Sequence, residues 1–157
     1  METAPAATAP LTQEMKATVE KQRLGFVATV SATGEPNVSP KGTFIVVDDR
    51  TLAFGDVRSP GTIANIRHRP DVEVNFVDPL SRKGFRAKGT ATVHVRGSDT
   101  YRELCVRFDR WGALAERIKH IVLIDVRTAK PLSSPVYDDG AQESDLRAQW
   151  ASVLLAE

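Results

Sequence analysis

The sequence contains very little cysteine, because Cys105 is the only one among 157 residues. A single cysteine cannot form an intramolecular disulfide, which excludes the small secreted folds that disulfides hold together. A chain of this length buries roughly two thirds of its unfolded surface, so a core can form without a disulfide or a structural metal. The length and composition therefore favour one compact domain.

The sequence also lacks a long apolar segment and a strong net charge. No run approaches the roughly 20 apolar residues that a membrane-spanning helix needs. The formal net charge is +1, so no overall field would attract nucleic acid or an anionic membrane. We therefore expect a cytoplasmic protein with no nucleic-acid or membrane partner, in which any anion site must be local.

Motifs for metal binding, covalent catalysis and phosphate loops are absent as well. His68, His94 and His120 are far apart, and none has ligand spacing with another histidine, a cysteine or a carboxylate. The chain has no Walker-type loop, no Rossmann glycine motif and no nucleophile elbow. We predict no metal site, leave the catalytic residues unassigned and expect a cofactor to carry any reaction.

Apolar and β-branched runs between turn residues predict a mainly β protein. Strands are expected at 26–30, 43–47, 51–54, 72–77, 87–95 and 121–126, with 37–40 as a short extended piece. Helices are expected at 11–22, from 59 to just before Pro70, at 98–108 and near the C-terminus, with a loop at 78–83 and a polar tail at 130–140. This irregular order favours an antiparallel barrel with helical additions over a doubly wound parallel sheet. Residues 1–10 are expected to be a disordered leader, and 11–157 a single domain including the C-terminal tail and helix.

The first candidate anion site is the segment 58–62, which follows a strand and opens a helix. Helix N-termini favour phosphate because their first N–H groups are unpaired and the dipole is positive there. Arg58 can add charge-assisted bonds, the hydroxyls of Ser59 and Thr62 can donate, and Gly61 would allow close approach of a ligand. Taken locally, a helix capped by Ser59 beside a solvated arginine is the commoner outcome.

The second candidate is the segment 39–43, with the sequence Ser39-Pro40-Lys41-Gly42-Thr43, at the break between two strands. A lysine at a strand end can reach a phosphate as a point charge. A surface turn with an exposed lysine is the commoner alternative. The two segments together, on strands expected to be neighbours, are a stronger indication than either alone.

The densest basic run is interpreted as a solvated or inter-subunit face. It contains Arg82, Lys83, Arg86 and Lys88, and only Phe85 interleaves an aromatic ring. Binding to single-stranded nucleic acid normally needs more stacking platforms than this run offers.

In their order along the chain, these segments resemble the pyridoxamine 5'-phosphate oxidase-like FMN-binding split-barrel proteins. The resemblance runs from about residue 15 to 126. The matching pieces are Gly34-Glu35-Pro36-Asn37, Ser39-Pro40-Lys41-Gly42, Leu52-Ala53-Phe54-Gly55-Asp56 with Arg58, Gly61-Thr62-Ile63-Ala64-Asn65-Ile66 and Lys88-Gly89-Thr90-Ala91. The tail around Pro135 and Trp150 is similar to a branch of the family predicted to bind flavin nucleotides.

The resemblance implies a six-stranded antiparallel split barrel that forms a homodimer, with FMN in grooves between the subunits. It also implies a phosphate site made by Lys41, Arg58, Ser59 and Thr62. Other expected cofactor contacts lie along 38–43 and 54–56, with support from the helix and from the partner subunit: Ser39, Pro40, Gly42, Thr43, Phe54, Gly55, Asp56, Gly61, Asn65 and Trp111.

The function implied by the resemblance is that of an FMN-dependent oxidoreductase with a small-molecule substrate or electron donor. The arginine and histidine pair that true pyridoxamine phosphate oxidases carry near the C-terminus is missing, so the vitamin B6 reaction is not expected. Three alternatives stay open. They are a non-enzymatic flavin-binding or electron-carrier protein, an F420-dependent reductase, and a barrel that has lost its cofactor and acts as an interaction module.

Overall fold

The computed structural model describes residues 9–156, which form one antiparallel sheet of seven strands with helices around it. The strands are β1 (Gly25–Val30), β2 (Pro36–Lys41), β3 (Phe44–Val46), β4 (Thr51–Asp56), β5 (Asp71–Asp78), β6 (Lys83–Val95) and β7 (His120–Ser133). The α-helices are α1 (Gln13–Gln22), α2 (Pro60–His68), α3 (Asp99–Leu104) and α4 (Glu143–Leu154), and the 3-10 helices are η1 (Cys105–Arg117) and η2 (Pro135–Tyr137). The expected disordered leader falls mostly on residues 1–8, outside the described residues.

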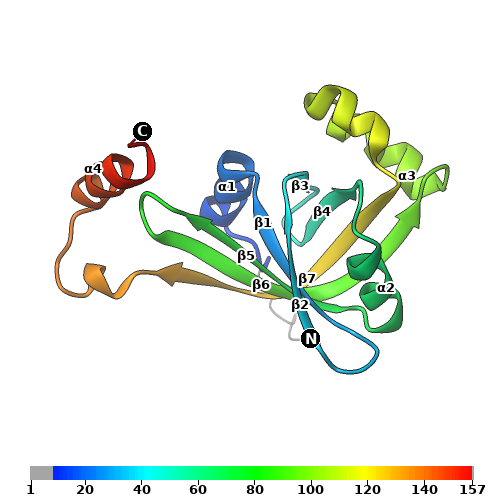
Figure 1. Cartoon of the computed structure of the whole chain (residues 1–157), viewed down its shortest axis with the longest axis horizontal. Helices are drawn as coiled ribbons and strands as arrows, with labels where there is room; N and C mark the ends of the chain where they lie inside the picture. The colour runs from blue at the N-terminus through cyan, green and yellow to red at the C-terminus, as the bar shows by residue number, and fades with distance from the viewer. Residues whose placement is uncertain (1–8, 157) are drawn as a thin grey trace, which may run out of the picture.

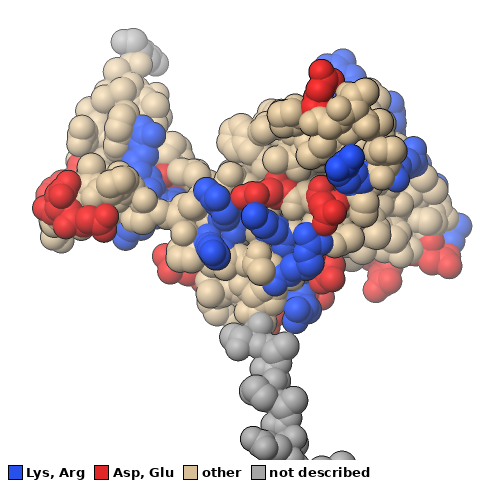
Figure 2. All heavy atoms as spheres, turned by 90° about the horizontal axis from the view of Figure 1, so that it is seen from below, with Lys and Arg blue, Asp and Glu red and all other residues tan. Residues whose placement is uncertain are grey.

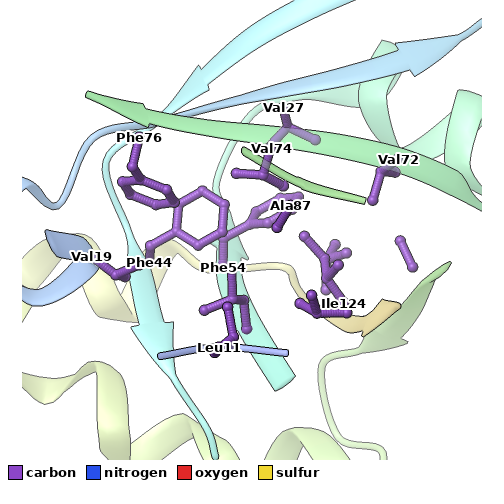
Figure 3. Packing of buried hydrophobic residues seen from close by; sticks show 14 of the residues in the cluster. Leu11, Val19, Val27, Phe44, Phe54, Val72, Val74, Phe76, Ala87 and Ile124 are labelled. Atoms are coloured by element: carbon purple, nitrogen blue, oxygen red, sulfur yellow. The ribbon is translucent and has the colours of Figure 1, made fainter. Parts of the chain in front are cut away.

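The sheet order is β2-β1-β5-β6-β7-β4-β3, and the sheet is strongly curled (Figure 1). Its concave side encloses an aromatic core. Inward-facing residues alternate with outward-facing ones along the strands. The ring of Phe44 contacts those of Phe54 and Phe76, with centroids 5.4 and 4.9 Å apart (Figure 3). The ring of Phe85 stacks on that of Phe76 at 5.5 Å. Helix α1 adds buried side chains, Val19 among them, to this core.

A second apolar layer covers only part of the outer sheet face. Helices α3 and η1 place Tyr101, Leu104 and Phe108 against outward-facing residues of β3, β4 and β7, such as Ile45 and Ile121. Gly112, with φ 55° and ψ −129°, lets the chain bend inside η1 in a conformation that other residues rarely adopt. No described element covers the outer face of β1, β2 and β5.

The predicted mainly β, antiparallel fold is confirmed, but the sheet has seven strands rather than six. The additional strand is β2, where only a short extended piece was expected. It pairs with β1 along its whole length, from Gly25 opposite Lys41 to Val30 opposite Pro36. Proline is tolerated in β2 because β2 is an edge strand, whose outer N–H positions need no partner.

The expected loop at 78–83 and tail from 130 were partly wrong, because β6 and β7 extend beyond the barrel. Lys83 pairs with Ser133, and the ladder continues to Val95 opposite His120. The register shifts between Lys88 and Gly89, where a Cβ would lie 2.4 Å from the backbone oxygen of Asp125. The expected helix at 98–108 is also different, since α3 ends at Leu104 and continues as a 3-10 helix.

The extended ends of β6 and β7 form an arm that carries α4. Figures 1 and 2 both show the α4 lobe set apart from the rest of the molecule. Polar and aromatic contacts attach it. Arg147 donates to Asp78 at 2.6 Å, Glu143 pairs with Lys83 at 3.2 Å, and the Arg82 guanidinium lies 3.5 Å from the centroid of Trp150. No helix among residues 9–156 is long and apolar enough to cross a bilayer.

The pKa of Asp78 is lower than its ordinary value, although burial alone would raise it. The Leu80 amide, Arg147 and Ser81 outweigh burial because they donate hydrogen bonds to the ionised carboxylate. The attachment of α4 therefore depends on a charged Asp78, and its contribution is lost as the pH falls through the folded-state pKa.

We expect Arg147→Ala to lower the free energy of unfolding by about 1 kcal/mol, because it leaves the buried Asp78 carboxylate short of a donor. Hydrogen exchange should show faster exchange in α4, with the barrel strands unchanged. Arg102→Ala is the control, because the pair of Arg102 with Asp99 is exposed and contributes little. Equal exchange in α4 for both variants would contradict this account.

Candidate functional site

The start of α2 lies beside the end of β2, although Ser59 and Lys41 are 18 positions apart along the chain. The predicted helix start is confirmed, with Pro60 as its first residue. The expected cap was wrong, because the Ser59 side chain makes no capping bond and instead accepts a hydrogen bond from Lys41. The first turn of α2 therefore has no side-chain cap, which leaves its N-terminus suited to an anion.

Lys41 is the centre of the site. It lies on the inward face of β2 with a residue exposure of 5%. Its ammonium donates to the hydroxyl of Ser39 at 2.7 Å and to that of Ser59, and it lies 5.7 Å from the Phe54 ring centroid. No carboxylate among residues 9–156 lies within ion-pair distance of this ammonium, so the commoner outcome of an exposed surface lysine was wrong.

Burial lowers the pKa of Lys41 below its ordinary value of 10.5, and the carboxylate of Asp56 partly opposes this effect. A buried ammonium that is hydrogen-bonded only to hydroxyls loses hydration without gaining a counter-ion. An anion at this position would supply the missing charge.

The buried Asp56 pairs with the partly exposed His120, a pairing that the sequence did not reveal. His120 Nδ1 lies 2.8 Å from Asp56 Oδ2, and the two residues are opposite each other in the ladder between β4 and β7. Asp56 is 2% exposed, and its Oδ1 has no hydrogen-bond partner in the described part of the chain. They are 64 positions apart along the chain, so there is no local signal, and only the strand register brings them together.

The other residues expected near the flavin occupy the same corner with different roles. Thr43 donates to the backbone oxygen of Gly55 at 2.6 Å, which ties β3 to the end of β4. Asn65 donates to Thr29 at 3.0 Å, so its amide links α2 to β1. The indole of Trp111 donates to the backbone oxygen of Gly42 at 3.1 Å, so this ring contacts the loop between β2 and β3 of its own chain.

The remaining expected residues lie around the start of α2. Thr62 is buried, whereas Pro40, Gly42, Arg58 and Gly61 are exposed. A Cβ at Gly61 would meet nothing within 4 Å, so the space in front of the first turn is open. A cleft of about 300 Å³ adjoins this turn and includes Asp56, Arg58, Ser59 and His120 in its walls. No group of His, Cys, Asp or Glu in residues 9–156 is arranged to hold a metal ion.

Comparison with known proteins identifies the relatives of this fold. A family model described as pyridoxamine 5'-phosphate oxidase matches residues 11–132. HupZ of Group A Streptococcus is 32% identical with a TM-score of 0.69, over 79% of this chain and 95% of that chain. A candidate pyridoxamine 5'-phosphate oxidase from Lactobacillus delbrueckii is 25% identical with a TM-score of 0.66, over 79% and 96%. No match was found among curated proteins.

More distant structures share the fold alone. An FMN-binding protein from Syntrophomonas wolfei has a TM-score of 0.67 at 13% identity, over 78% of this chain and 86% of that chain. An F420 reductase has a TM-score of 0.58 at 20% identity, over 76% and 98%. HutZ, the heme storage protein of Vibrio cholerae, has a TM-score of 0.62 at 17% identity, over 78% and 94%.

We expect Lys41→Met to raise the free energy of unfolding of the ligand-free protein by about 1 kcal/mol, because it removes a buried charge without a counter-ion. In the wild type, the Lys41 ammonium keeps its proton to a higher pH in the unfolded chain than in the folded chain. The gain should therefore be largest at neutral pH and fade as the pH rises through the folded-state pKa toward 10.5. Urea unfolding at several pH values measures both effects. Lys130→Met, at an exposed position, is the control, and a Lys41→Met protein less stable than wild type would contradict this interpretation.

Proposed function

The chain belongs to the pyridoxamine 5'-phosphate oxidase family, and from this premise we propose that it binds FMN and acts as an oxidoreductase on a small molecule. The observation that carries the proposal is the buried ammonium of Lys41, hydrogen-bonded to Ser39 and Ser59 and without a carboxylate partner among residues 9–156. A phosphate beside it would gain this charge, the first N–H groups of α2 and the free guanidinium of Arg58.

Each neighbouring residue has a defined task in this proposal. Ser39 and Ser59 orient the Lys41 ammonium, and the Phe54 ring below it keeps water away. Trp111, fixed by its bond to Gly42, forms a wall next to the same loop. Bound FMN would supply reversible hydride and electron transfer, which side chains do not provide. A cytoplasmic location belongs to this proposal, because the single cysteine provides no disulfide.

A flavin-binding protein without turnover is the second candidate function. It is favoured by the charges next to the loop of Gly42, which are the cations of Lys41 and of Arg110 over the Trp111 ring, whereas the pair of Asp56 and His120 adjoins the start of α2. Oxidation of NAD(P)H by the FMN-loaded protein with any acceptor would separate an enzyme from a carrier. F420 and heme, which the names of two distant structures mention, are tested in the same titrations as FMN.

We further propose that two copies associate through the outer face of β1, β2 and β5. This face carries Phe26 and Val38, which are 42% and 63% exposed, and no described element covers it. Asn75 lies next to Phe26 in the strand register, and its side-chain oxygen is buried without a partner in the described chain. A donor from a second copy would satisfy that oxygen, and burial of the apolar side chains would stabilise the pair.

We expect the wild-type protein to sediment as a dimer at micromolar concentration. Val38→Glu should shift it toward the monomer, because a carboxylate would be buried in the proposed interface. Val136→Glu, at another exposed valine in η2, is the control and should remain dimeric. A wild-type monomer in sedimentation equilibrium would rule out the proposed association.

We expect FMN to stabilise the protein against heat, and Arg58→Ala to weaken FMN binding by roughly 1.5–3 kcal/mol, the range for a charge-assisted hydrogen bond. Quenching of flavin fluorescence measures the affinity. Arg69→Ala, at the opposite end of α2, is the matched control and should bind FMN as wild type does. Unchanged affinity in Arg58→Ala would remove Arg58 from the phosphate site. A wild-type protein that takes up no FMN, but binds F420 or hemin, would overturn the choice of cofactor.

A further inference from the structure

The 3-10 helix η1 lies along the free edge of β3, where a neighbouring strand is missing. β3 is one edge of the sheet, so only β4 pairs with it. Backbone groups of residues 43 and 47 bond to β4, so the carbonyl groups of residues 42, 44 and 46 point to the free side. Three side chains of η1 donate hydrogen bonds to these carbonyl oxygens: Arg107 to Val46, Arg110 to Phe44 at 2.8 Å and Trp111 to Gly42 at 3.1 Å.

The spacing of these donors matches the spacing of the acceptors. Three residues of a 3-10 helix rise about 6 Å, and two residues of a strand span roughly 6.6 Å. Arg107 and Arg110 are three positions apart, and their acceptors on β3 are two positions apart, so η1 follows the strand in the opposite direction. Side chains of η1 therefore satisfy an edge that would otherwise be open to water or to another chain.

Arg110 connects η1 with two other elements. Its Nη1 pairs with Glu20 of α1 at 2.6 Å, and its Nη2 bonds to β3. Its guanidinium also lies 4.2 Å from the ring centroid of Trp111. The same ring contacts that of the buried Phe108, with centroids 5.7 Å apart. Arg110 and Phe108 thus hold the indole in the orientation in which its N–H meets Gly42.

Gly42 is the point at which these contacts reach the candidate site. It directly follows Lys41, and glycine has more backbone freedom than any other residue. A Cβ at Gly42 would meet nothing within 4 Å, so packing does not restrain this residue. The bond from Trp111 is the one hydrogen bond of its backbone within residues 9–156. The indole N–H therefore restrains the backbone that follows Lys41.

We propose that Trp111 and Arg110 are positioning residues of the phosphate site. They act through Gly42, and they keep Lys41 beside the first turn of α2, where its ammonium bonds to Ser59. The inference rests on the proposed function and adds the element that controls this site. Because η1 on the β3 edge favours the binding geometry, ligand binding must in turn stabilise η1 on that edge.

Trp111→Phe removes the N–H donor and keeps an aromatic ring in its place. We expect it to weaken FMN binding roughly three- to tenfold, the range for one hydrogen bond. Arg110→Gln loses the pair with Glu20 and the contact with the indole, so it should weaken FMN binding as well. Trp150→Phe in α4 and Arg102→Gln in α3 are the matched controls, and both should bind FMN as wild type does.

A double-mutant cycle with Lys41 distinguishes positioning from a purely structural effect. If Trp111 acts through Lys41, Trp111→Phe should change the FMN affinity by less than roughly twofold in a Lys41→Met background. Urea unfolding shows whether each variant is folded, and hydrogen exchange of residues 105–117 measures the coupling. FMN should slow this exchange in the wild type and slow it less in Trp111→Phe.

The outcomes separate this inference from the proposed function. If FMN binds but Trp111→Phe and Arg110→Gln retain the wild-type affinity, the inference is overturned and the proposed function stands. The inference is also overturned if Trp111→Phe weakens binding equally with and without Lys41, since the ring would then act on the cofactor directly. If Trp111→Phe does not fold, Arg110→Gln takes its place in the same cycle. If the wild type takes up no FMN, the proposed function fails and the inference fails with it.

Discussion

The hydrogen-bonded ladder between β6 and β7 is the constraint on which the other parts of the molecule depend. It extends from Lys83 opposite Ser133 to Val95 opposite His120, and its register shifts once, at Gly89. On one side of the shift the two strands belong to the curled sheet around the aromatic core. On the other side Phe85 and Ala87 still belong to that core, and beyond them the strands lead into an arm that carries α4 and is held by ion pairs.

Closure of the curled sheet assembles the candidate site. β2 and β3 are the two edges of the sheet, yet only Gly42 and Thr43 separate them along the chain. The curl must therefore bring the two edges together at this point. The end of β4, which is the neighbour of β3, then lies next to the end of β2, and Ser59 at the start of α2 reaches the ammonium of Lys41. The site is thus a product of barrel closure and not of any local motif.

This dependence explains which features the sequence could predict. Strand alternation and the start of α2 at Pro60 are local, so residue patterns indicated them correctly. The burial of Lys41 and its bond to Ser59 depend on closure, and local reading favoured an exposed lysine and a capping serine instead. The resemblance to a known family, carried by the order of segments, predicted that Lys41 and Ser59 belong to one site. The pair of Asp56 and His120 carried no local pattern and no family motif, so only the strand register revealed it.

The site combines charges of two kinds, and they recognise an anion differently. Folding has already removed water from the buried ammonium of Lys41, which lowers the free energy of unfolding. A phosphate therefore binds this ammonium without the full desolvation cost. Its attraction for phosphate acts through protein and is weakly screened by salt. The exposed guanidinium of Arg58 keeps its hydration and is screened within a Debye length of about 8 Å at physiological salt. Recognition of the phosphate should therefore depend on the protonation of Lys41 and, through Arg58, on ionic strength.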